Sequence, residues 1–327
     1  MKLGVLLLNL GGPTTLSEVK PFLYNLFSDA DILPVPFSTY LQKPFAKFVA
    51  WRRHKLSKGY YEAIGGGSPI QKITQAQATL LERALKADAF VVKVYVAMRY
   101  WYPSTDMAWS QMIADEITDL VVLPLYPQYS LTTTQSSFNA LKRVMDGSAY
   151  TVKKVHWINH WYDHSAYLEV MGMLIRETIE KLPSEFQNTY DLLYSAHSLP
   201  LSVVQKGDPY EKHIHETMRL LLPHLPITVS GHEYLSYQSK AGPLPWLEPS
   251  TFKMLKTLSH RKRALIMVPI SFVSDHVETL YEMDILYRKE AEKYGIPYFS
   301  RVPALNTHPL FMNALASLVK QTIEGKI

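Results

Sequence analysis

The stretch DLLYSAHSLP, residues 191–200, joins an apolar run to a polar turn. The run from Leu192 to Tyr194 is typical of a buried strand, and the polar residues that follow include His197. In an open parallel sheet, the side chains after the carboxyl end of a strand face the ligand crevice. We therefore expect a parallel sheet with His197 in its crevice. A lone histidine can also be structural, so a functional role requires a chemical partner elsewhere in the chain.

Short apolar runs alternate with longer amphipathic runs along the whole chain. Runs rich in leucine and β-branched residues are typical of parallel strands covered on both faces, and their alternation with helices indicates an α/β fold. The strand-like runs are 3–10, 90–98, 120–126, 151–158, 190–196, 226–230, 264–270 and 297–302. The helical runs are 71–87, 104–117, 134–146, 164–181, 209–222, 250–259, 275–294 and 308–324.

The two halves of the chain resemble each other. LLLNLGGP opens the first half and LLYSAHSLP the second, and each half later repeats a strand, a proline, a polar turn and a helix. A chain of 327 residues is long enough for two domains. We predict two Rossmann-like domains, each with a four-stranded parallel sheet flanked by helices, and a cleft between them. The predicted boundaries are 1–160 for the first domain, 161–307 for the second, and 308–327 for a final helix that packs back on the first.

Composition narrows the class of protein. The net charge is +5 and the pI about 9.0, but Lys and Arg are scattered, which does not indicate a nucleic-acid partner. Cysteine is absent, so no disulfide or cysteine-ligated iron–sulfur cluster can form. The first residues lack signal-peptide features, and no apolar run is long enough to span a membrane. We expect a cytoplasmic protein, with peripheral contact to the inner face of the membrane as an option. Nothing in the sequence indicates the oligomeric state.

Residues 31–69 do not fit the strand–helix alternation. This segment combines prolines, many aromatic residues and a basic cluster that includes Arg52, Arg53, Lys55 and Lys58. An apolar lip with a basic border would suit a membrane surface or a large flat ligand. Alternatively, its aromatic side chains pack beneath the segment as a small separate core. The sequence leaves both interpretations open.

The stretch FVSDHVETLYEMD, residues 272–284, offers partners for His197. It follows an apolar strand, so the helix predicted there begins at the same edge of the sheet. Ser274 or Asp275 can cap this helix, and Asp275, Glu278 and Glu282 would then share one face. One imidazole and a row of carboxylates suit a divalent metal that is held transiently, such as iron(II). A solvated helix face with a good cap is the structural alternative.

Three other motifs follow strands or open helices. IGGGSPI, residues 64–70, lacks the P-loop lysine, and its glycines instead favour close backbone approach to something flat. MRYWYPS, residues 98–104, places Arg99 where it can meet a carboxylate. QSKAGPLPWL, residues 238–247, presents Trp246 either as a rigid platform or as part of the core. No G-x-S-x-G elbow supports a serine hydrolase.

Together these motifs resemble ferrochelatase, the enzyme family that inserts iron(II) into protoporphyrin. The resemblance is collinear and covers nearly the whole chain: LLLNLGGP, IGGGSPI, MRYWYPS, LPLYPQYS, YSAHSLP, QSKAGPLPWL and PISFVSDHVETLYEMD. SAHSLP and SDHVETLYE at this spacing carry most of the specificity. The resemblance implies a two-domain chelatase fold with the porphyrin in the cleft.

The resemblance also implies roles for individual residues. His197 and Glu278 match the family's catalytic and metal-binding positions, and Asp275, His276 and Glu282 extend a path for protons or metal. Our hypothesis gives His197 the proton-accepting role, since two pyrrole protons must leave the ring, and Glu278 the partner role. The residues that the resemblance places against the porphyrin are Arg99, Tyr100, Tyr61, Ser68, Trp246, Phe272 and Leu33.

The implied substrates are protoporphyrin IX and Fe(II), with protohaem as the product. No cofactor is expected: Fe(II) is a substrate, and no iron–sulfur cluster is expected in a chain without cysteine. The QSKAGPLPWL motif favours protoporphyrin over coproporphyrin. We also expect peripheral membrane contact through residues 31–53. Two alternatives remain: a periplasmic-type binding protein that only carries a metal complex, and a chelatase that handles cobalt or nickel.

Overall fold

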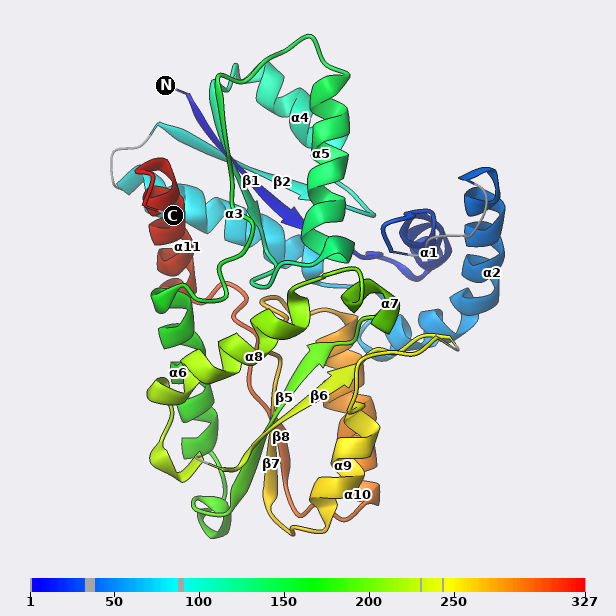
Figure 1. The fold of residues 1–327 in the computed structure, drawn as a ribbon, viewed down its shortest axis with the longest axis vertical. Helices are drawn as coiled ribbons and strands as arrows, with labels where there is room; N and C mark the ends of the chain where they lie inside the picture. Colours follow the sequence, from blue (N-terminus) through cyan, green and yellow to red (C-terminus); the bar gives the residue numbers. More distant parts are fainter. Residues whose placement is uncertain (1, 33–38, 88–90, 230, 243, 327) are drawn as a thin grey trace. The chain divides into compact units, whose positions relative to one another are not determined.

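A computed structural model describes residues 2–32, 39–87, 91–229, 231–242 and 244–326. The chain divides into two compact units. Unit 1 contains Met1–His160 and Met312–Ile327, and unit 2 contains Trp161–Phe311. Each unit is built on a four-stranded parallel sheet with helices beside it (Figure 1). The predicted fold class is therefore confirmed.

The sheet of unit 1 has the order β2-β1-β3-β4, and every neighbouring pair is parallel. All seven residues of β1 are buried, as a central parallel strand requires. The strand order reverses direction between β1 and β3, which is where α/β sheets open a crevice. The strands are β1 (Leu3–Asn9), β2 (Val92–Met98), β3 (Asp119–Pro124) and β4 (Lys154–Trp157).

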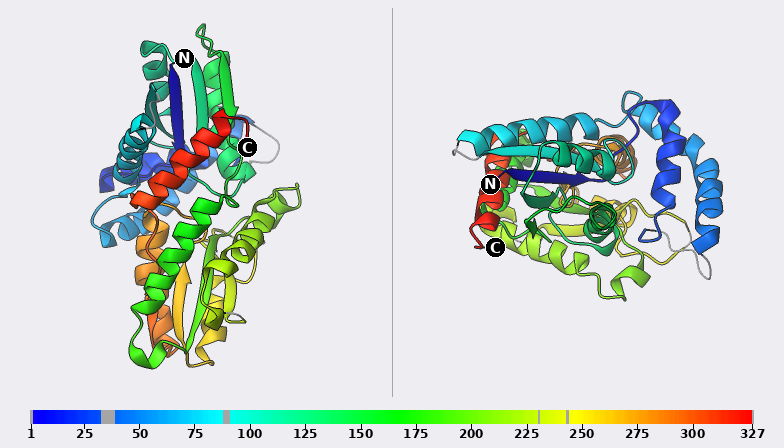
Figure 2. Two further views of the ribbon diagram at one scale, coloured as in Figure 1. Left: turned by 90° about the vertical axis from the view of Figure 1, so that its left-hand side faces the viewer. Right: turned by 90° about the horizontal axis from the view of Figure 1, so that it is seen from above.

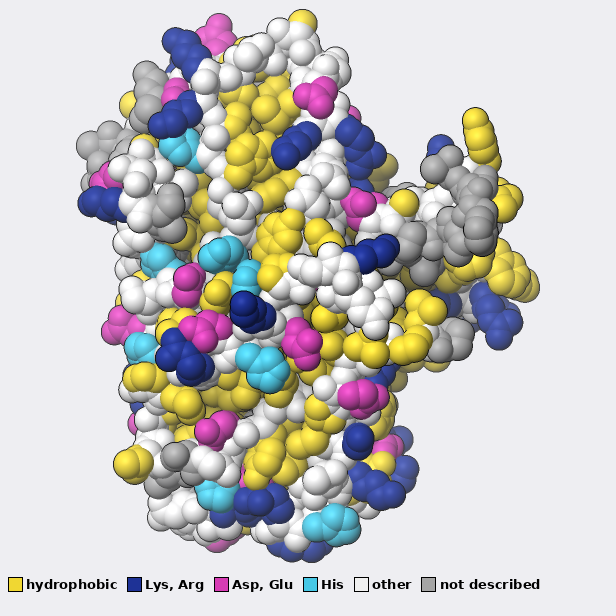
Figure 3. Space-filling model, in the orientation of Figure 1, with side chains coloured by type: hydrophobic (Ala, Val, Ile, Leu, Met, Phe, Trp, Pro, Cys, Tyr) yellow, Lys and Arg dark blue, Asp and Glu magenta, His cyan; other side chains and the backbone are white. Residues whose placement is uncertain are grey.

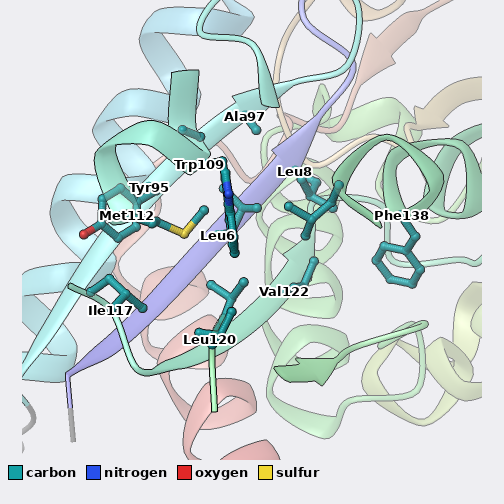
Figure 4. Close-up of a cluster of buried hydrophobic side chains, with 13 residues drawn as sticks. Leu6, Leu8, Tyr95, Ala97, Trp109, Met112, Ile117, Leu120, Val122 and Phe138 are labelled. Atoms are coloured by element: carbon teal, nitrogen blue, oxygen red, sulfur yellow. The ribbon is translucent and has the colours of Figure 1, made fainter. Parts of the chain in front are cut away.

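Helices cover both faces of this sheet (Figure 2). Alternate residues of β1 point to opposite faces, so Leu6 and Leu8 pack with Trp109 and Phe138 from α4 and α5 (Figure 4), while α3 contacts β1 and β2. The helical segments are η1 (Leu16–Glu18), α1 (Val19–Phe27), α2 (Thr39–Ala63), α3 (Ile70–Ala87), α4 (Thr105–Ala114), the π-helix η2 (Leu131–Gln135), α5 (Ser136–Asp146) and α11 (Pro309–Ile323).

Unit 2 repeats the same strand order, β6-β5-β7-β8, again fully parallel. The direction of the order therefore reverses between β5 and β7, and the carboxyl ends of these two strands are neighbours. The strands are β5 (Tyr190–His197), β6 (Glu233–Gln238), β7 (Ala264–Val268) and β8 (Phe299–Arg301).

The helices of unit 2 include a wide helix, η6, that directly follows the turn after β7. Its side chains Met283 and Tyr287 join Leu193, Leu265 and other apolar residues in a buried core. The helical segments are α6 (Ser165–Glu180), η3 (Ser184–Phe186), α7 (Leu201–Val204), α8 (Tyr210–Leu221), η4 (Leu222–His224), η5 (Ile227–Val229), α9 (Thr251–Ser259), the π-helix η6 (Glu278–Tyr287) and α10 (Arg288–Lys293).

Three local predictions are wrong. The strand predicted over 226–230 is not found in the described part of that range: η5 occupies Ile227–Val229, and β6 begins at Glu233. The strand EYLSYQ was not recognised because it is an edge strand whose first three residues are only half-buried, so it lacks an apolar run. The helix predicted over 275–294 begins only at Glu278 and is a π-helix up to Tyr287.

The segment 31–69 contains a regular helix that the sequence reading did not anticipate. α2 is 25 residues long and includes Pro44. Three of its buried residues, Gln42, Ala46 and Ala50, recur every four residues on one face, and Gln42 Nε2 donates to the Phe27 carbonyl of α1 at 2.9 Å. Tyr61, near the end of α2, is also buried. The aromatic residues point elsewhere, since Phe48 and Trp51 are 55% and 58% exposed. Phe48 and Trp51 therefore do not form a separate core, whereas Tyr61 is buried.

Candidate functional site

His197 is the last residue of β5, at the edge where the strand order of unit 2 reverses. Its backbone N–H donates to Ser271 Oγ at 3.1 Å, which ties the end of β5 to the turn after β7. The side chain is 37% exposed, in contrast to the seven buried residues before it in the strand. The structure therefore places His197 at the crevice position that the sequence predicts.

The ring of His197 is held in one orientation. Nδ1 lies 2.7 Å from the carbonyl oxygen of Ser198. A carbonyl oxygen can only accept, so we infer that Nδ1 carries the hydrogen and donates it. The lone pair then resides on Nε2, which lies 3.6 Å from Glu278 Oε1. Nε2 is thus free to accept a proton or bind a metal beside a carboxylate.

Glu278 lies between two imidazoles. Its Oε1 faces His197, and its Oε2 contacts Nε2 of His276. Burial alone would raise the pKa of Glu278, but the charge and hydrogen bond of His276, with a smaller effect from His197, lower it to about 2. Glu278 is therefore a carboxylate at neutral pH although its side chain is only 22% exposed.

His276 is the cationic partner of this carboxylate. Its Nδ1 donates to the Ser274 carbonyl oxygen at 2.9 Å, so the Nε2 that contacts Glu278 must carry a second hydrogen when the pair is fully bonded. Burial would lower the pKa of His276, but the charge and hydrogen bond of Glu278 raise it above its ordinary value. His276 is thus suited to neutralise Glu278 when no metal is bound.

Glu282 lies one helical turn after Glu278 and behaves differently. Its Oε2 accepts from Gln238 Nε2 at 2.9 Å and from Ser239 Oγ at 2.6 Å. Burial and the charge of Glu278 raise its pKa to about 7, against the smaller opposing effect of these two hydrogen bonds. Two carboxyl groups of one helix therefore have widely separated pKa values, which is typical of acid–base sites.

Aromatic side chains lie beside the charged groups of unit 2. The Phe272 ring is edge-on to both imidazoles, with its centroid 6.5 Å from that of His197 and 4.8 Å from that of His276. Trp246 forms a backbone bridge with Pro200, shortly after His197, and its buried Nε1 has no hydrogen-bond partner. The structure thus brings Phe272 and the Trp246 segment to the same strand end as His197.

Asp275 has a different position from the one predicted. It precedes η6, so the prediction that it shares a helix face with Glu278 and Glu282 is wrong. The residue before the helix is Val277, and neither Ser274 nor Asp275 is the cap. Both carboxylate oxygens of Asp275 are engaged, by Thr279 Oγ1 at 2.9 Å and Asn306 Nδ2 at 2.7 Å.

Arg99 and Tyr100 follow β2 in unit 1 and bind one buried carboxylate. Asp29 Oδ2 accepts from an Arg99 Nη at 2.7 Å, from the Tyr100 hydroxyl at 2.7 Å and from Ser136 Oγ at 2.5 Å. Arg99 also donates through Nε to Ser136 at 2.8 Å. The predicted arginine–carboxylate contact is therefore made within the protein itself. Arg99 also lines two cavities of about 660 Å³ and 580 Å³.

The remaining predicted residues of unit 1 pack around the glycine loop. Tyr61 and Ser68 are buried, and the Ser68 backbone N–H donates to the Pro13 carbonyl oxygen at 2.7 Å. A Cβ at Gly67 would lie 2.2 Å from the Thr14 carbonyl oxygen, so the close approach at this position is to the chain's own backbone. Leu33 lies outside the described residues.

Sequence reasoning missed several residues that hold the site. Asp29 is in FSDAD, where only its position after an apolar helix signals it, and Gln238 and Ser239 belong to the strand that was not recognised. Among the residues that the structure describes, no three His, Asp or Glu side chains are grouped closely enough to hold a metal together. Nor does any helix in the described ranges have the length and hydropathy to cross a membrane.

The ferrochelatase family model matches residues 2–323, nearly the whole of the chain. The chain belongs to the ferrochelatase family. It is 46% identical to the ferrochelatase of Synechococcus elongatus over 326 residues, which cover 99% of this chain and 83% of that protein. The ferrochelatase of Nostoc punctiforme is also 46% identical, with 99% and 83% covered.

Solved chelatase structures share the fold of the chain at low sequence identity. SirB from Bacillus subtilis with Fe3+ matches with a TM-score of 0.60 and 14% identity, covering 98% of this chain and 96% of SirB. DR2241 from Deinococcus radiodurans, a multi-domain protein with structural similarity to chelatases, matches with a TM-score of 0.50 and 12% identity. That match covers 97% of this chain and 54% of DR2241. At these identities the likeness concerns the fold alone.

Proposed function

We propose that the chain inserts Fe(II) into protoporphyrin IX, releases two protons and forms protohaem, with the chemistry carried out at the end of β5. Family membership supports the reaction class. The observation that carries the assignment of the site is the His197 Nε2 lone pair, fixed by Ser198 and facing Glu278 at 3.6 Å. Metal insertion requires a base that can take pyrrole protons and a group that can pass the metal on.

His197 supplies the base in this proposal. A neutral imidazole accepts a proton through its unprotonated nitrogen, and Nε2 of His197 is the nitrogen that does not donate to the backbone. Because the Ser198 contact fixes the ring, little reorientation is needed before the proton moves. The Nε2 lone pair can bind Fe(II) or accept a pyrrole proton, but not both at once, so a proton held on Nε2 must pass on before the atom can bind metal.

Glu278 is the partner for metal or proton transfer. Its lowered pKa, about 2, keeps it anionic, so it attracts Fe(II) and stabilises a protonated His197. Two side chains make an incomplete coordination sphere, and an incomplete sphere can release the metal to the porphyrin. His276 can balance the charge of Glu278 before the metal arrives.

Glu282 is the next member of the proton path. With a pKa of about 7 it can take up or release a proton near neutrality, whereas both oxygens of Asp275 already have partners. We therefore assign Glu282 to the relay and leave Asp275 a supporting position beside it. No cofactor enters this scheme, and the chain has no cysteine to ligate an iron–sulfur cluster.

Porphyrin contacts in this scheme come first from unit 2. Phe272 lies edge-on to both histidines, and the Trp246 segment is bridged to the residues after His197. An apolar macrocycle would pack against such rings. The contacts assigned to Arg99, Tyr100, Tyr61 and Ser68 stay predictions, as does the preference for protoporphyrin over coproporphyrin.

The outer face of α2 is proposed as a peripheral membrane contact. Tyr40, Phe48 and Trp51 are 91%, 55% and 58% exposed, and exposed Lys43, Lys47 and Arg52 belong to the same helix. Figure 3 shows hydrophobic side chains gathered over this helix. Apolar residues with basic neighbours are typical of helices that lie on anionic lipid surfaces.

Flotation with phosphatidylserine-containing vesicles would test this surface. The double variant Phe48→Ser, Trp51→Ser should float with the vesicles at least tenfold less than the wild type, because each lost ring contributes about 1.5–3 kcal/mol when buried in lipid. Ile227→Ser is the matched control, since Ile227 is 91% exposed but lies in unit 2. Equal flotation of all three proteins would contradict the membrane contact.

The reaction is tested by anaerobic mixing of the protein with protoporphyrin IX and Fe(II), followed by absorption spectroscopy. Wild type should convert porphyrin to protohaem, and Glu278→Gln should slow this by about 10²–10⁴-fold, the range for loss of an acid–base group. Porphyrin binding without conversion in both proteins would instead indicate a carrier. Faster conversion with Co(II) or Ni(II) than with Fe(II) would favour the alternative metal chelatase.

A further inference from the structure

Arg301 occupies the carboxyl end of β8, the edge strand beside β7. The strand fixes its backbone: Arg301 pairs in register with Met267, and the next backbone N–H, that of Val302, donates to the Met267 carbonyl oxygen at 2.9 Å. The side chain is only 10% exposed. A guanidinium that is buried at a fixed strand end needs anionic partners, and it can hold them firmly in place.

The guanidinium of Arg301 binds two carboxylates, one within η6 and one in the turn before it. Asp284, within η6, is bound side-on, with Arg301 Nε and one Nη each 2.8 Å from a carboxylate oxygen. The other Nη lies 3.1 Å from Asp275 Oδ1, three residues before the helix begins. Arg301 therefore joins the entry of the helix to its middle.

From Asp275 the contacts continue to the charged pair of the site. Asp275 Oδ1 accepts from the fully buried hydroxyl of Thr279, and the same hydroxyl oxygen accepts from the His276 backbone N–H at 3.1 Å. His276 in turn contacts Glu278. Three consecutive contacts thus link Arg301 to the backbone of the residue that holds Glu278.

The kind of helix explains why such support is needed. A π-helix has i→i+5 hydrogen bonds and is rare in proteins, where it occurs mainly as short segments at functional sites. η6 extends over ten residues, so contacts from outside must favour it over an ordinary α-helix. Gln238 supplies one such contact by donating to the Glu278 carbonyl oxygen at 3.1 Å, and Arg301 supplies the charged ones.

We propose that Arg301 is a positioning residue that holds η6 and the Asp275 turn in register, so that His276 and Glu278 face His197. Arg301 touches neither imidazole and acts only through Asp275, Asp284 and Thr279. The inference rests on the proposed function for its effect on turnover, but the geometric part can be measured without turnover.

The test compares Arg301→Gln and Arg301→Lys with a matched control, Arg288→Gln. Arg288 also joins η6 to β8, through bonds to the Asp284 and Phe299 carbonyl oxygens, but it binds no carboxylate. Arg301→Gln should lower kcat by about 10–100-fold, as changes to groups that orient metal ligands do, with the KM for protoporphyrin within about twofold. Arg301→Lys should be intermediate, because an ammonium cannot bind Asp284 side-on and Asp275 together.

A second arm asks whether the effect passes through Asp275. Asp275→Asn should also lower kcat, and the double variant Arg301→Gln, Asp275→Asn should cost less than the product of the two single losses. Rates are divided by the fraction of protein that binds protoporphyrin, measured by fluorescence quenching, so that misfolded protein does not count. If Arg301→Gln does not fold, Arg301→Lys and Asp275→Asn decide the matter.

Hydrogen exchange of the amides of 275–287 separates this inference from the proposed function. Exchange should be at least tenfold faster in Arg301→Gln and Asp275→Asn than in wild type, and unchanged in Arg288→Gln. A wild type without turnover would contradict the proposed function, whereas the exchange data would still test the positioning role. Unchanged exchange, or a normalised kcat equal to that of Arg288→Gln, would overturn the role of Arg301.

Discussion

The two sheets share one strand order but end differently. β1 ends in Asn9 and its counterpart β5 ends in His197. Asn9 is 5% exposed, and both ends of its amide are hydrogen-bonded: Nδ2 donates to Thr74 Oγ1 at 3.0 Å, and Oδ1 accepts from the Leu10 backbone N–H at 2.9 Å. His197 keeps one ring nitrogen free beside a carboxylate.

The charged groups near the strand ends of the two units show the same contrast. In unit 1, Asp29 and Arg99 neutralise each other and are surrounded by hydroxyl groups. In unit 2, Glu278 lies between two imidazoles, which can lose or gain a proton. Both units therefore share the strand order, whereas their side chains differ: the carboxylate of unit 1 is bound by a permanently charged guanidinium, and the carboxylate of unit 2 by imidazoles.

The largest expected effect is at His197. His197→Ala should lower kcat for protohaem formation by about 10²–10⁴-fold, because the base beside Glu278 is removed. The absorption assay under anaerobic conditions measures it, and porphyrin binding by fluorescence quenching confirms that the protein is folded. Normal turnover in this variant would contradict the proposal that His197 takes part in the chemistry and Asn9 does not.

A large effect on stability is expected at the buried pair of unit 1. Asp29→Asn leaves Arg99 buried without its carboxylate and should lower the free energy of unfolding by about 3–5 kcal/mol. Urea unfolding monitored by fluorescence gives the value. Glu216→Gln is the control, since its pair with Arg219 lies in solvent and its loss should change the free energy of unfolding far less. Equal losses in both variants would show that Asp29 is not a stabilising centre.

Glu282 gives a smaller effect that depends on pH. Its pKa is raised from 4.5 to about 7, so the folded protein binds its proton more tightly than the unfolded chain does. The resulting stability is present below pH 4.5 and is lost as the pH rises through 7, a change of about 3 kcal/mol. The amide of Glu282→Gln does not titrate, so the free energy of unfolding of this variant should rise relative to that of wild type by up to that amount between pH 5 and pH 8. Urea unfolding at each pH measures the difference. A constant difference between the two proteins would contradict the raised pKa.

The smallest effect is expected at Asn9. Asn9→Ala removes two buried hydrogen bonds and should lower the free energy of unfolding by about 1–3 kcal/mol, while kcat per folded molecule stays within about twofold of wild type. Urea unfolding and the absorption assay are run on the same preparation. A kcat loss as large as that of His197→Ala would show that the end of β1 also takes part in the chemistry.

The pattern of apolar and polar residues along the chain is enough to predict the class of fold and the polar residues at the strand ends. Buried apolar runs such as that of β1, alternating with helical patterns, are typical of parallel strands covered on both faces, and polar residues directly after such runs are expected at the carboxyl edge of the sheet. This reasoning puts His197 and the Glu278 segment at the same edge of one sheet, and the structure adds that their strands, β5 and β7, are neighbours. The pattern does not reveal an edge strand such as β6, whose first residues are only half-buried. Nor does it reveal a helix such as α2, which buries small and polar residues and exposes aromatic ones.

Tertiary structure alone decided which partner each charge has. Asp29 meets Arg99 across 70 residues of chain, and Arg301 meets Asp275 from the edge strand β8. It also decided the π-helix: local propensity favours an α-helix over 275–294, whereas contacts from Gln238 and Arg301 hold the wider form from Glu278. These contacts are long-range, so no local pattern in the sequence records them, and the pKa values of Glu278 and Glu282 depend on them and on burial.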